Sequence, residues 1–286
     1  IPDTQFNADS DYHFIQRQVD FGPSIPNTPA HDSCAVFLKE KLKCFNLDVV
    51  TQKAALTAYN GVKLNIENII ASVNPSAPNK IILCAHWDTR PFADQDAIDN
   101  NKPFDGANDG GSGTGVLLEI ARLLGKTPPD IGVDLIFFDA EDYGKSNVEN
   151  SYCLGSQYWA KNINRTNYYP KYGILIDMVG APNATFAMEG YSMQYAPNVV
   201  KKVWKTAARH GYSDYFIFKK TGAVMDDHFY VNTIANIPCI DIIHHDPATR
   251  SGFGSYWHTQ NDNMKMVDKN TLKAVGQTLL EVIYSE

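Results

Sequence analysis

The stretch Ile81-Ile-Leu-Cys-Ala-His-Trp-Asp88 decides the fold class of this chain. It is a short apolar run followed at once by a histidine and a carboxylate. Such a run is typical of a strand that is buried on both faces of a parallel sheet. In open α/β sheets, the residues that follow such strands gather at one edge, where functional sites form. We therefore expect a parallel sheet with its chemistry at the carboxyl ends of the strands.

Further apolar runs at residues 133–138, 174–178 and 238–243 have the same character. Helical patterns at residues 113–124, 154–161, 198–210 and 271–284 lie between or after them. This alternation predicts an α/β fold with a mostly parallel central sheet and helices on both faces. No linker divides the chain, so we expect a single domain over residues 1–286.

The first quarter of the chain has a different pattern. Two amphipathic helical stretches lie between Asp11 and Leu47, and the second is expected to begin at Thr28-Pro29, because proline is favoured in the first helical turn. Residues 49–60 and 62–73 read as two strands, and Asn60-Gly61 between them is a strong hairpin signal. The sheet is therefore expected to be mixed.

Composition and charge restrict the class of protein. The 286 residues are 44% hydrophobic and 12% aromatic, enough for a large core, so a disordered chain is excluded. The net charge of −7 argues against a nucleic-acid or anionic-membrane partner, which an acidic surface would repel. The longest apolar runs are only a few residues, so no transmembrane segment is expected.

Two features bear on the cellular compartment. The chain begins Ile1-Pro2-Asp3 without the segments of a signal peptide, so we expect either a cytoplasmic protein or one whose targeting segment has been removed. Five cysteines, at positions 34, 44, 84, 153 and 239, include no C-x-x-C pair. Their odd number and mostly apolar contexts favour buried thiols over a disulfide framework.

Polar residues that could perform chemistry follow the predicted strands. They are His86 and Asp88, then Asp139, Glu141 and Asp142, then Asp177, with Asp109 in a glycine-rich loop at residues 106–113 and His258 near the end of the chain. Imidazole nitrogens and carboxylate oxygens from separate strand ends suit a four-coordinate zinc ion. The sequence therefore contains the donors of a zinc site.

Each of these features has a plainer interpretation when taken alone. His86 could be a packed histidine paired with a carboxylate, and the glycine-rich loop could bind phosphate, although it lacks the Walker lysine and a G-x-G-x-x-G motif. The carboxylates at residues 139–142 could form a solvated acidic turn. However, three carboxylates directly after a buried strand repel one another without a cation. The combination favours a metal site.

Read in order, the motifs resemble the zinc-dependent aminopeptidase-like family M28. That family has an H-x-D motif, an aspartate in a glycine-rich loop, a Glu-Glu or Glu-Asp pair, an aspartate after a strand and a late histidine. Here these positions correspond to His86, Asp109, Glu141-Asp142, Asp177 and His258. The resemblance covers nearly the whole chain.

Within that family, three segments resemble the bacterial branch of the glutaminyl cyclases (glutaminyl-peptide cyclotransferases). Residues 180–186 follow Asp177 as they do in the cyclases. Residues 226–228 are Asp-Asp-His where peptidases commonly have Ser-Asp-His, and Trp257 directly precedes the late histidine. Tyr152 is the candidate for a second aromatic wall, because the second tryptophan of the animal cyclases is missing here.

The resemblance implies a function and a set of roles. The expected reaction converts the N-terminal glutamine of peptides or proteins to pyroglutamate with release of ammonia. One zinc ion is expected, with Asp109, Asp142 and His258 as its ligands. Glu141 is expected to act as general acid and base, together with Asp177 and Asp226, and Trp257 is expected to bind the substrate. Asp227 is expected to be an N-cap or an ion-pair partner, or to be functional.

Two other functions stay open at this point. A zinc aminopeptidase would use Glu141 to activate water and would hold a second metal through His86 and Asp177. A binding module that has lost catalysis would have lost ligand positions, and none is lost here. The resemblance further implies a periplasmic or exported protein, with or without a lipoprotein anchor before processing, which we expect to be a monomer.

Overall fold

The computed structural model describes residues 4–286, so residues 1–3, on which the compartment expectation partly rests, lie outside the described residues. One sheet of six strands has the order β1-β2-β4-β3-β5-β8. Its strands are β1 (Asp48–Thr57), β2 (Lys63–Val73), β3 (Lys80–His86), β4 (Gly132–Phe138), β5 (Gly173–Asp177) and β8 (Cys239–Ile243). The principal helices are α1 (Ala8–Asp20), α2 (Pro29–Cys44), α3 (Gly111–Lys126), α4 (Leu154–Lys161), α6 (Pro197–Arg209), α7 (Asp227–Thr233) and α8 (Lys269–Tyr284).

The sheet is mixed, and the predicted fold class is confirmed. β3 pairs in parallel with β4 and β5, and β5 pairs in parallel with β8, whereas β1–β2 and β2–β4 are antiparallel. The register sets His86 opposite Phe138 and Asp177 opposite Ile243. The parallel strands therefore end together, and the polar residues that follow them meet at one edge.

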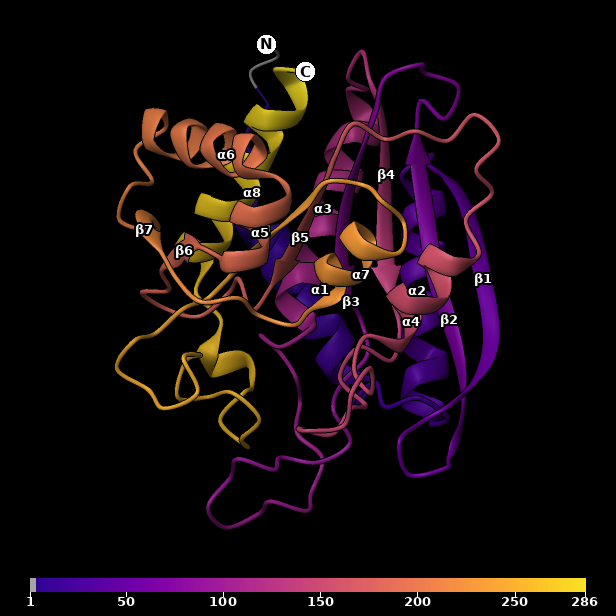
Figure 1. Ribbon diagram of the computed structural model, residues 1–286, viewed down its shortest axis with the longest axis vertical. Helices are drawn as coiled ribbons and strands as arrows, with labels where there is room; N and C mark the ends of the chain where they lie inside the picture. The colour runs from indigo at the N-terminus through magenta and orange to yellow at the C-terminus, as the bar shows by residue number, and fades with distance from the viewer. Residues whose placement is uncertain (1–3) are drawn as a thin grey trace.

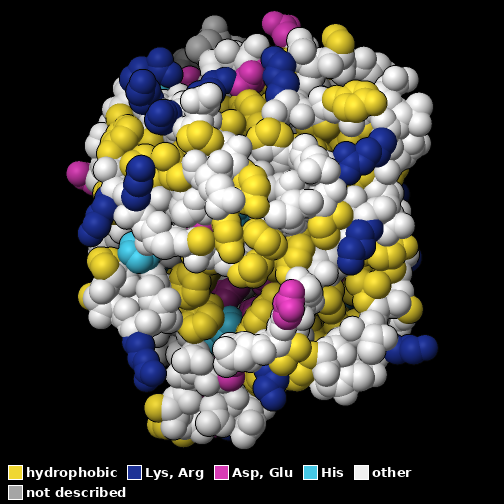
Figure 2. All heavy atoms as spheres, in the orientation of Figure 1, with side chains coloured by type: hydrophobic (Ala, Val, Ile, Leu, Met, Phe, Trp, Pro, Cys, Tyr) yellow, Lys and Arg dark blue, Asp and Glu magenta, His cyan; other side chains and the backbone are white. Residues whose placement is uncertain are grey.

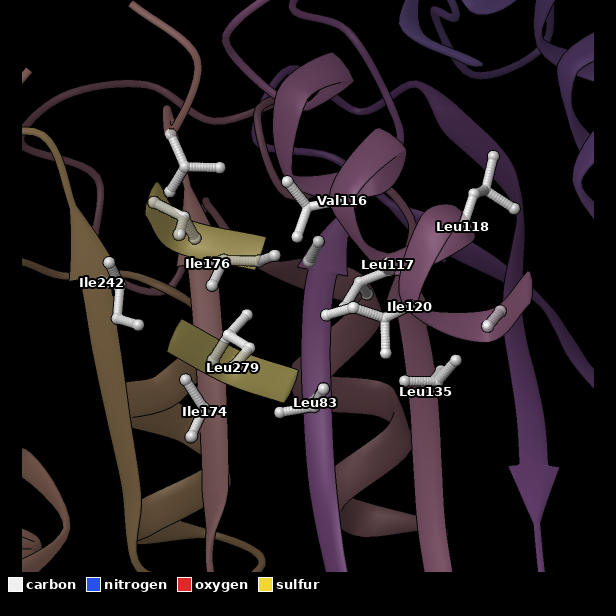
Figure 3. Packing of buried hydrophobic residues seen from close by; sticks show 14 of the residues in the cluster. Leu83, Val116, Leu117, Leu118, Ile120, Leu135, Ile174, Ile176, Ile242 and Leu279 are labelled. Atoms are coloured by element: carbon white, nitrogen blue, oxygen red, sulfur yellow. The ribbon is translucent and has the colours of Figure 1, made fainter. Parts of the chain in front are cut away.

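Helices cover both faces of the sheet (Figure 1). Alternate strand residues explain this, because successive side chains point to opposite faces. Leu83 and its equivalents in the other strands belong to a large core with α1, α2, α3 and α8, while Ile82 and its equivalents pack on α4 and α7. Figure 3 shows Ile120 of α3 lying near Leu83 and Leu135, with α8 over β5. Because both of its faces are buried, the sheet and its carboxyl edge have a fixed position in the fold.

The hairpin forms as predicted, but its turn is longer than expected. The first strand ends at Thr57 instead of residue 60, and a turn over residues 58–62 connects it to β2. Within this turn, the Gly61 backbone N–H donates to the Ala58 carbonyl (2.9 Å) and the Ala58 N–H donates to the Val62 carbonyl (2.8 Å). Gly61 has φ +84°, which glycine adopts easily.

Several short elements were not expected from the sequence. β6 (Phe186–Met188) and β7 (Phe216–Lys220) form a separate two-stranded sheet, and α5 (Gly190–Tyr195) follows β6. α7 was also unexpected, and its N-cap is Asp226, whose carboxylate accepts the Asp227 N–H. The N-cap role considered for Asp227 is therefore wrong.

The cysteines are free thiols among the described residues, as predicted. Four are buried, and Cys44 is exposed. Within residues 4–286, no helix combines the length and the apolar character needed to cross a membrane.

Candidate active site

A cavity of about 370 Å³ opens at the carboxyl edge of the sheet. All seven residues predicted for the site line it: Asp109, Glu141, Asp142, Asp177, Asp226, Trp257 and His258. Tyr152, the candidate second aromatic, lines it too. Figure 2 shows a hollow on this face, with acidic and histidine side chains at its floor and hydrophobic side chains around its rim.

The residues after β3 hold the loop after β4 in place. Asp88 accepts the backbone N–H groups of Glu141 (2.8 Å) and Asp142 (3.1 Å) through its two oxygens. Its side chain is fully buried, so these bonds are shielded from water. The carboxylate of the H-x-D motif thus positions the Glu-Asp pair.

The glycine-rich loop presents Asp109 to the cavity. Asp262 accepts the backbone N–H groups of Asn108 (2.7 Å) and Asp109 (3.0 Å). Gly110 has φ +83°, and a Cβ on it would lie 2.8 Å from the Asp88 carbonyl oxygen and 2.9 Å from His86 Cε1. Glycine is required here, because the loop packs directly on the end of β3.

Asp109 lies between two groups of possible metal ligands. One comprises Asp109, Asp142 and His258, in which His258 Nε2 is 3.2 Å from Asp142 Oδ2 and 3.5 Å from Asp109 Oδ2. The other comprises His86, Asp109 and Asp177, in which His86 Nε2 is 3.1 Å from Asp109 Oδ1 and 3.3 Å from Asp177 Oδ1. Both groups are buried. The chain therefore has the donors for one metal ion or for two sharing Asp109.

His258 is fixed from both sides of its ring. Its Nδ1 lies 3.0 Å from Asp94 Oδ1, which leaves Nε2 directed toward the ligand group. The Trp257 ring stacks on the imidazole at 3.9 Å between centroids. Arg90 contacts Asp94 (2.7 Å) and Asp142 Oδ1 (3.2 Å), so one buried cation connects both carboxylates. A carboxylate on the far nitrogen of a ligand histidine is the arrangement that orients such ligands.

The charges of the ligand group depend on one another. Burial opposes ionisation of Asp109, but hydrogen bonds with His258 and His86 outweigh it and hold its pKa below the usual value. Burial alone would lower the pKa of His258, yet the charge of Asp142 and hydrogen bonds with Asp109, Asp142 and Asp94 raise it well above the usual value. The acidic donors therefore demand a positive charge, from a proton or from a metal ion.

Three further carboxyls line the same cavity, and burial disfavours the ionised form of each. Burial raises the pKa of Glu141 well above its usual value, and it raises that of Asp177 to about 7 against the opposing effect of His86. The pKa of Asp226 is also raised by burial. Cys153 donates its thiol hydrogen to Glu141 Oε1 (3.2 Å). Perturbed carboxyls in a cleft are typical of proton-transfer sites.

Backbone strain is concentrated around the cavity. Four described residues that are neither glycine nor asparagine have left-handed φ values, and each lines the cavity or directly adjoins a residue that does: Ala140 (50°), Cys153 (58°), Met178 (48°) and His258 (54°). Such conformations cost free energy and persist where the surrounding structure enforces them, often at functional sites.

Sequence reasoning missed four residues that support the site. Asp88 was singled out only as part of a motif, and Arg90, Asp94 and Asp262 were not singled out for the site. Asp94 is 164 positions from its partner His258, so no local spacing indicates the contact. The one available signal was the buried position expected for Asp88 directly after a strand.

Residues 68–283 match the profile of peptidase family M28. This chain belongs to peptidase family M28. The match covers the sheet from the middle of β2 onward and every candidate site residue.

Solved structures of similar chains extend the likeness to nearly all of the residues of this chain. The structure of Tannerella forsythia glutaminyl cyclase is 52% identical, covers 99% of this chain and 100% of its own, and superposes with a TM-score of 0.97. A Zn-dependent exopeptidase from Parabacteroides distasonis has the same identity and TM-score and covers 99% of both chains. Bovine glutaminyl-peptide cyclotransferase is 26% identical over 75% of this M28 chain, which spans only 64% of that enzyme.

Proposed function

We propose that this M28 protein is a zinc-dependent glutaminyl-peptide cyclotransferase, an acyltransferase that forms pyroglutamate from N-terminal glutamine. The observation that carries the proposal is the set of three buried carboxyls, Glu141, Asp177 and Asp226, that line one cavity with the ligand group. Several carboxyls with raised pKa values suit a reaction that moves protons between two nitrogens. The likeness to the Tannerella forsythia cyclase over 99% of this chain supports it.

Cyclisation sets clear chemical demands. The α-amino nitrogen forms a bond to the side-chain amide carbon, and the bond from that carbon to the amide nitrogen breaks. The α-ammonium nitrogen must lose two protons to become the lactam N–H: one is released before the attack, and the second passes to the departing nitrogen, which leaves as ammonia. We assign this transfer to Glu141, and a positioned general acid and base of this kind contributes about 10²- to 10⁴-fold in rate.

We assign one zinc ion to Asp109, Asp142 and His258. Two carboxylates and one imidazole match the donors that zinc prefers and leave a position for substrate. Asp142 Oδ2 is buried and makes no well-directed hydrogen bond among the described residues; its near neighbour, His258 Nε2 at 3.2 Å, is an atom of the same ligand group, as expected where both atoms face a metal ion. When bound, zinc supplies a Lewis acid for the side-chain carbonyl of glutamine.

The remaining assigned residues hold the substrate. Asp226 Oδ2 is buried without a hydrogen-bond partner in the described structure, and Asp177 Oδ1 is buried with His86 Nε2 3.3 Å away but no well-directed hydrogen bond. We assign these oxygens to the amide nitrogen of the glutamine side chain, with one of the two carboxyls protonated near neutral pH. Trp257 packs against the side chain and excludes water that would hydrolyse the amide.

A zinc aminopeptidase is the second candidate, and the group of His86, Asp109 and Asp177 favours it. With two metal ions, Glu141 would activate a water molecule for peptide hydrolysis. Zinc stoichiometry separates the two functions: one tightly bound zinc per chain supports the cyclotransferase, and two support the peptidase.

Ammonia release tests the proposed function. A peptide that begins with glutamine should release ammonia when incubated with zinc-loaded protein, because cyclisation expels the amide nitrogen. The same peptide with an acetylated α-amine should release none, since the attacking nitrogen is blocked. Equal release from both peptides would indicate amide hydrolysis and contradict the proposal.

Compartment and assembly belong to the same proposal. From the family resemblance we also propose a periplasmic or exported protein that acts as a monomer on peptides and proteins. Cell fractionation of the source organism and size-exclusion chromatography with light scattering test these two points.

A further inference from the structure

A second groove adjoins the candidate active site. It has a volume of about 490 Å³ and is lined by the loop at residues 145–152 and by residues at the start of α7. Its apolar wall consists of Val148, Tyr152, Met225, Phe229 and Tyr230. None of the functions assigned above uses Val148, Phe229 or Tyr230.

The groove adjoins the active-site cavity and shares part of its wall. Tyr152 and Met225 line both spaces. The loop that bears Val148 begins three residues after Asp142, and the segment that bears Phe229 begins at the N-cap Asp226. The two segments that supply site carboxyls therefore continue as the two walls of the groove. A peptide whose first residue occupies the cavity has the groove within reach of its next one or two residues, at about 3.3–3.6 Å per residue.

The chemistry of the groove suits an apolar group. Val148 is 42% exposed and Met225 is 48% exposed, so apolar side chains face solvent here. The Tyr230 hydroxyl donates to Asn150 Oδ1 (3.0 Å), so its polar end is already satisfied. Phe229 packs edge-on against Tyr230 at 5.3 Å between ring centroids. Covering such a wall with an apolar side chain gains free energy by removing both surfaces from water.

The charges at the groove do not favour a charged ligand. Lys145 and Glu149, which line it, carry opposite charges. A positively or negatively charged side chain would meet one favourable and one unfavourable partner. The burial of apolar surface is therefore the main contribution to binding that can discriminate between substrates.

We propose that this groove binds a large apolar side chain, such as that of phenylalanine, at the second or third residue of the substrate peptide. The proposal rests on the proposed function, because it takes the cavity to hold the N-terminal glutamine. It assigns a substrate preference to Val148, Phe229 and Tyr230.

Three peptides and two variants test it. The peptides are Gln-Ala-Ala, Gln-Phe-Ala and Gln-Ala-Phe, and the readout is the ratio of kcat/KM for each phenylalanine peptide to that for Gln-Ala-Ala. Val148→Asp places a carboxylate in the groove on an exposed loop. Val36→Asp is the matched control, because Val36 is similarly exposed (49%) but lies on α2 outside the groove.

The wild-type protein and Val36→Asp should prefer one phenylalanine peptide by about tenfold, the discrimination that a partly buried apolar side chain provides. Val148→Asp should reduce that ratio to within about twofold of unity. A wild-type ratio near unity, or an unchanged preference in Val148→Asp, overturns the inference while ammonia release from Gln-Ala-Ala leaves the proposed function standing. If no peptide is cyclised, the proposed function fails and this inference falls with it.

Discussion

Glu141 and Asp109 illustrate how neighbours, more than residue type, set the chemistry of a carboxyl. Both are buried, yet the pKa of Asp109 is lowered because two histidines contact it, whereas that of Glu141 is raised because burial dominates. Asp109 thus suits a permanent ligand, and Glu141 suits a group that gains and loses a proton.

Replacing Glu141 with glutamine should separate catalysis from metal binding. Glu141→Gln keeps the size of the side chain but cannot exchange a proton, so we expect kcat to fall by about 10²- to 10⁴-fold. Zinc content, measured by elemental analysis, should not change, because Glu141 is outside the assigned ligand set. Glu40→Gln, at an exposed position on α2, is the control. Full activity in Glu141→Gln would remove this residue from the mechanism.

His258→Ala tests the ligand set. Without this imidazole, Asp109 and Asp142 face each other with no third protein donor, and we expect zinc to be lost during dialysis. His210→Ala, at an exposed histidine that contacts Glu281 and belongs to neither ligand group, should keep its zinc. Unchanged zinc content in His258→Ala would contradict the assigned ligands.

At the level of single residues, the sequence predicts some parts of a site and not others. The seven lining residues could be identified because each directly follows a strand or sits in a motif of known order. Asp94 and Asp262 could not, because each acts on residues more than 150 positions away. The hydrogen-bond partners of their carboxylates come close only when the chain is folded.

At the scale of single elements, the start of α3 depends on close contact with the end of β3. Gly110→Ala would force a Cβ within 3 Å of Asp88 and His86. Gly211→Ala is a matched control, because Gly211 has the same φ of +83° but no atom within 4 Å of the added Cβ.

We expect Gly211→Ala to lower the free energy of unfolding by about 1 kcal/mol through its backbone conformation alone. Gly110→Ala should lower the free energy of unfolding by about 1–3 kcal/mol more than Gly211→Ala does, which is the cost typical of an overpacked site. Urea denaturation of the two variants gives the comparison. Equal losses would mean that the contact between α3 and β3 is not tight.

Elements with strong periodicity were predictable, and the weak ones were not. α4 begins and ends where the pattern predicted, and β3 differs by one residue at each end. β6 has only three residues, and the apolar run of β7 is short and belongs to a strand that is mostly exposed, so neither resembles the buried runs of the central sheet. The turn after β1 was misplaced because Asn60-Gly61 lies inside a longer turn instead of forming a two-residue loop.

At the scale of the whole molecule, one buried histidine should influence acid stability. Burial lowers the pKa of His244 to about 4, and its Nδ1 lies 2.9 Å from the Tyr256 hydroxyl. The unfolded chain therefore binds a proton between pH 6.5 and 4 that the folded protein does not. Stability from this residue is present above pH 6.5 and is lost as the pH falls toward 4, by up to about 3 kcal/mol.

His244→Asn should weaken this pH dependence, because asparagine keeps a polar atom near Tyr256 but does not titrate in this range. The measurement is the difference in unfolding free energy between pH 7 and pH 4.5, which cancels the packing change common to both conditions. His210→Asn should leave that difference at the wild-type value. The idea fails if His244→Asn and wild-type protein lose stability equally on acidification.

The central claim is that this M28 chain cyclises N-terminal glutamine. Mass spectrometry of a short peptide that begins with glutamine, incubated with zinc-loaded protein and with an enzyme-free control, tests it most directly. The account predicts a product lighter by one ammonia, with every peptide bond intact. Release of free glutamine and a peptide shortened by one residue would contradict it and would assign His86, Asp109 and Asp177 to a second metal ion in an aminopeptidase.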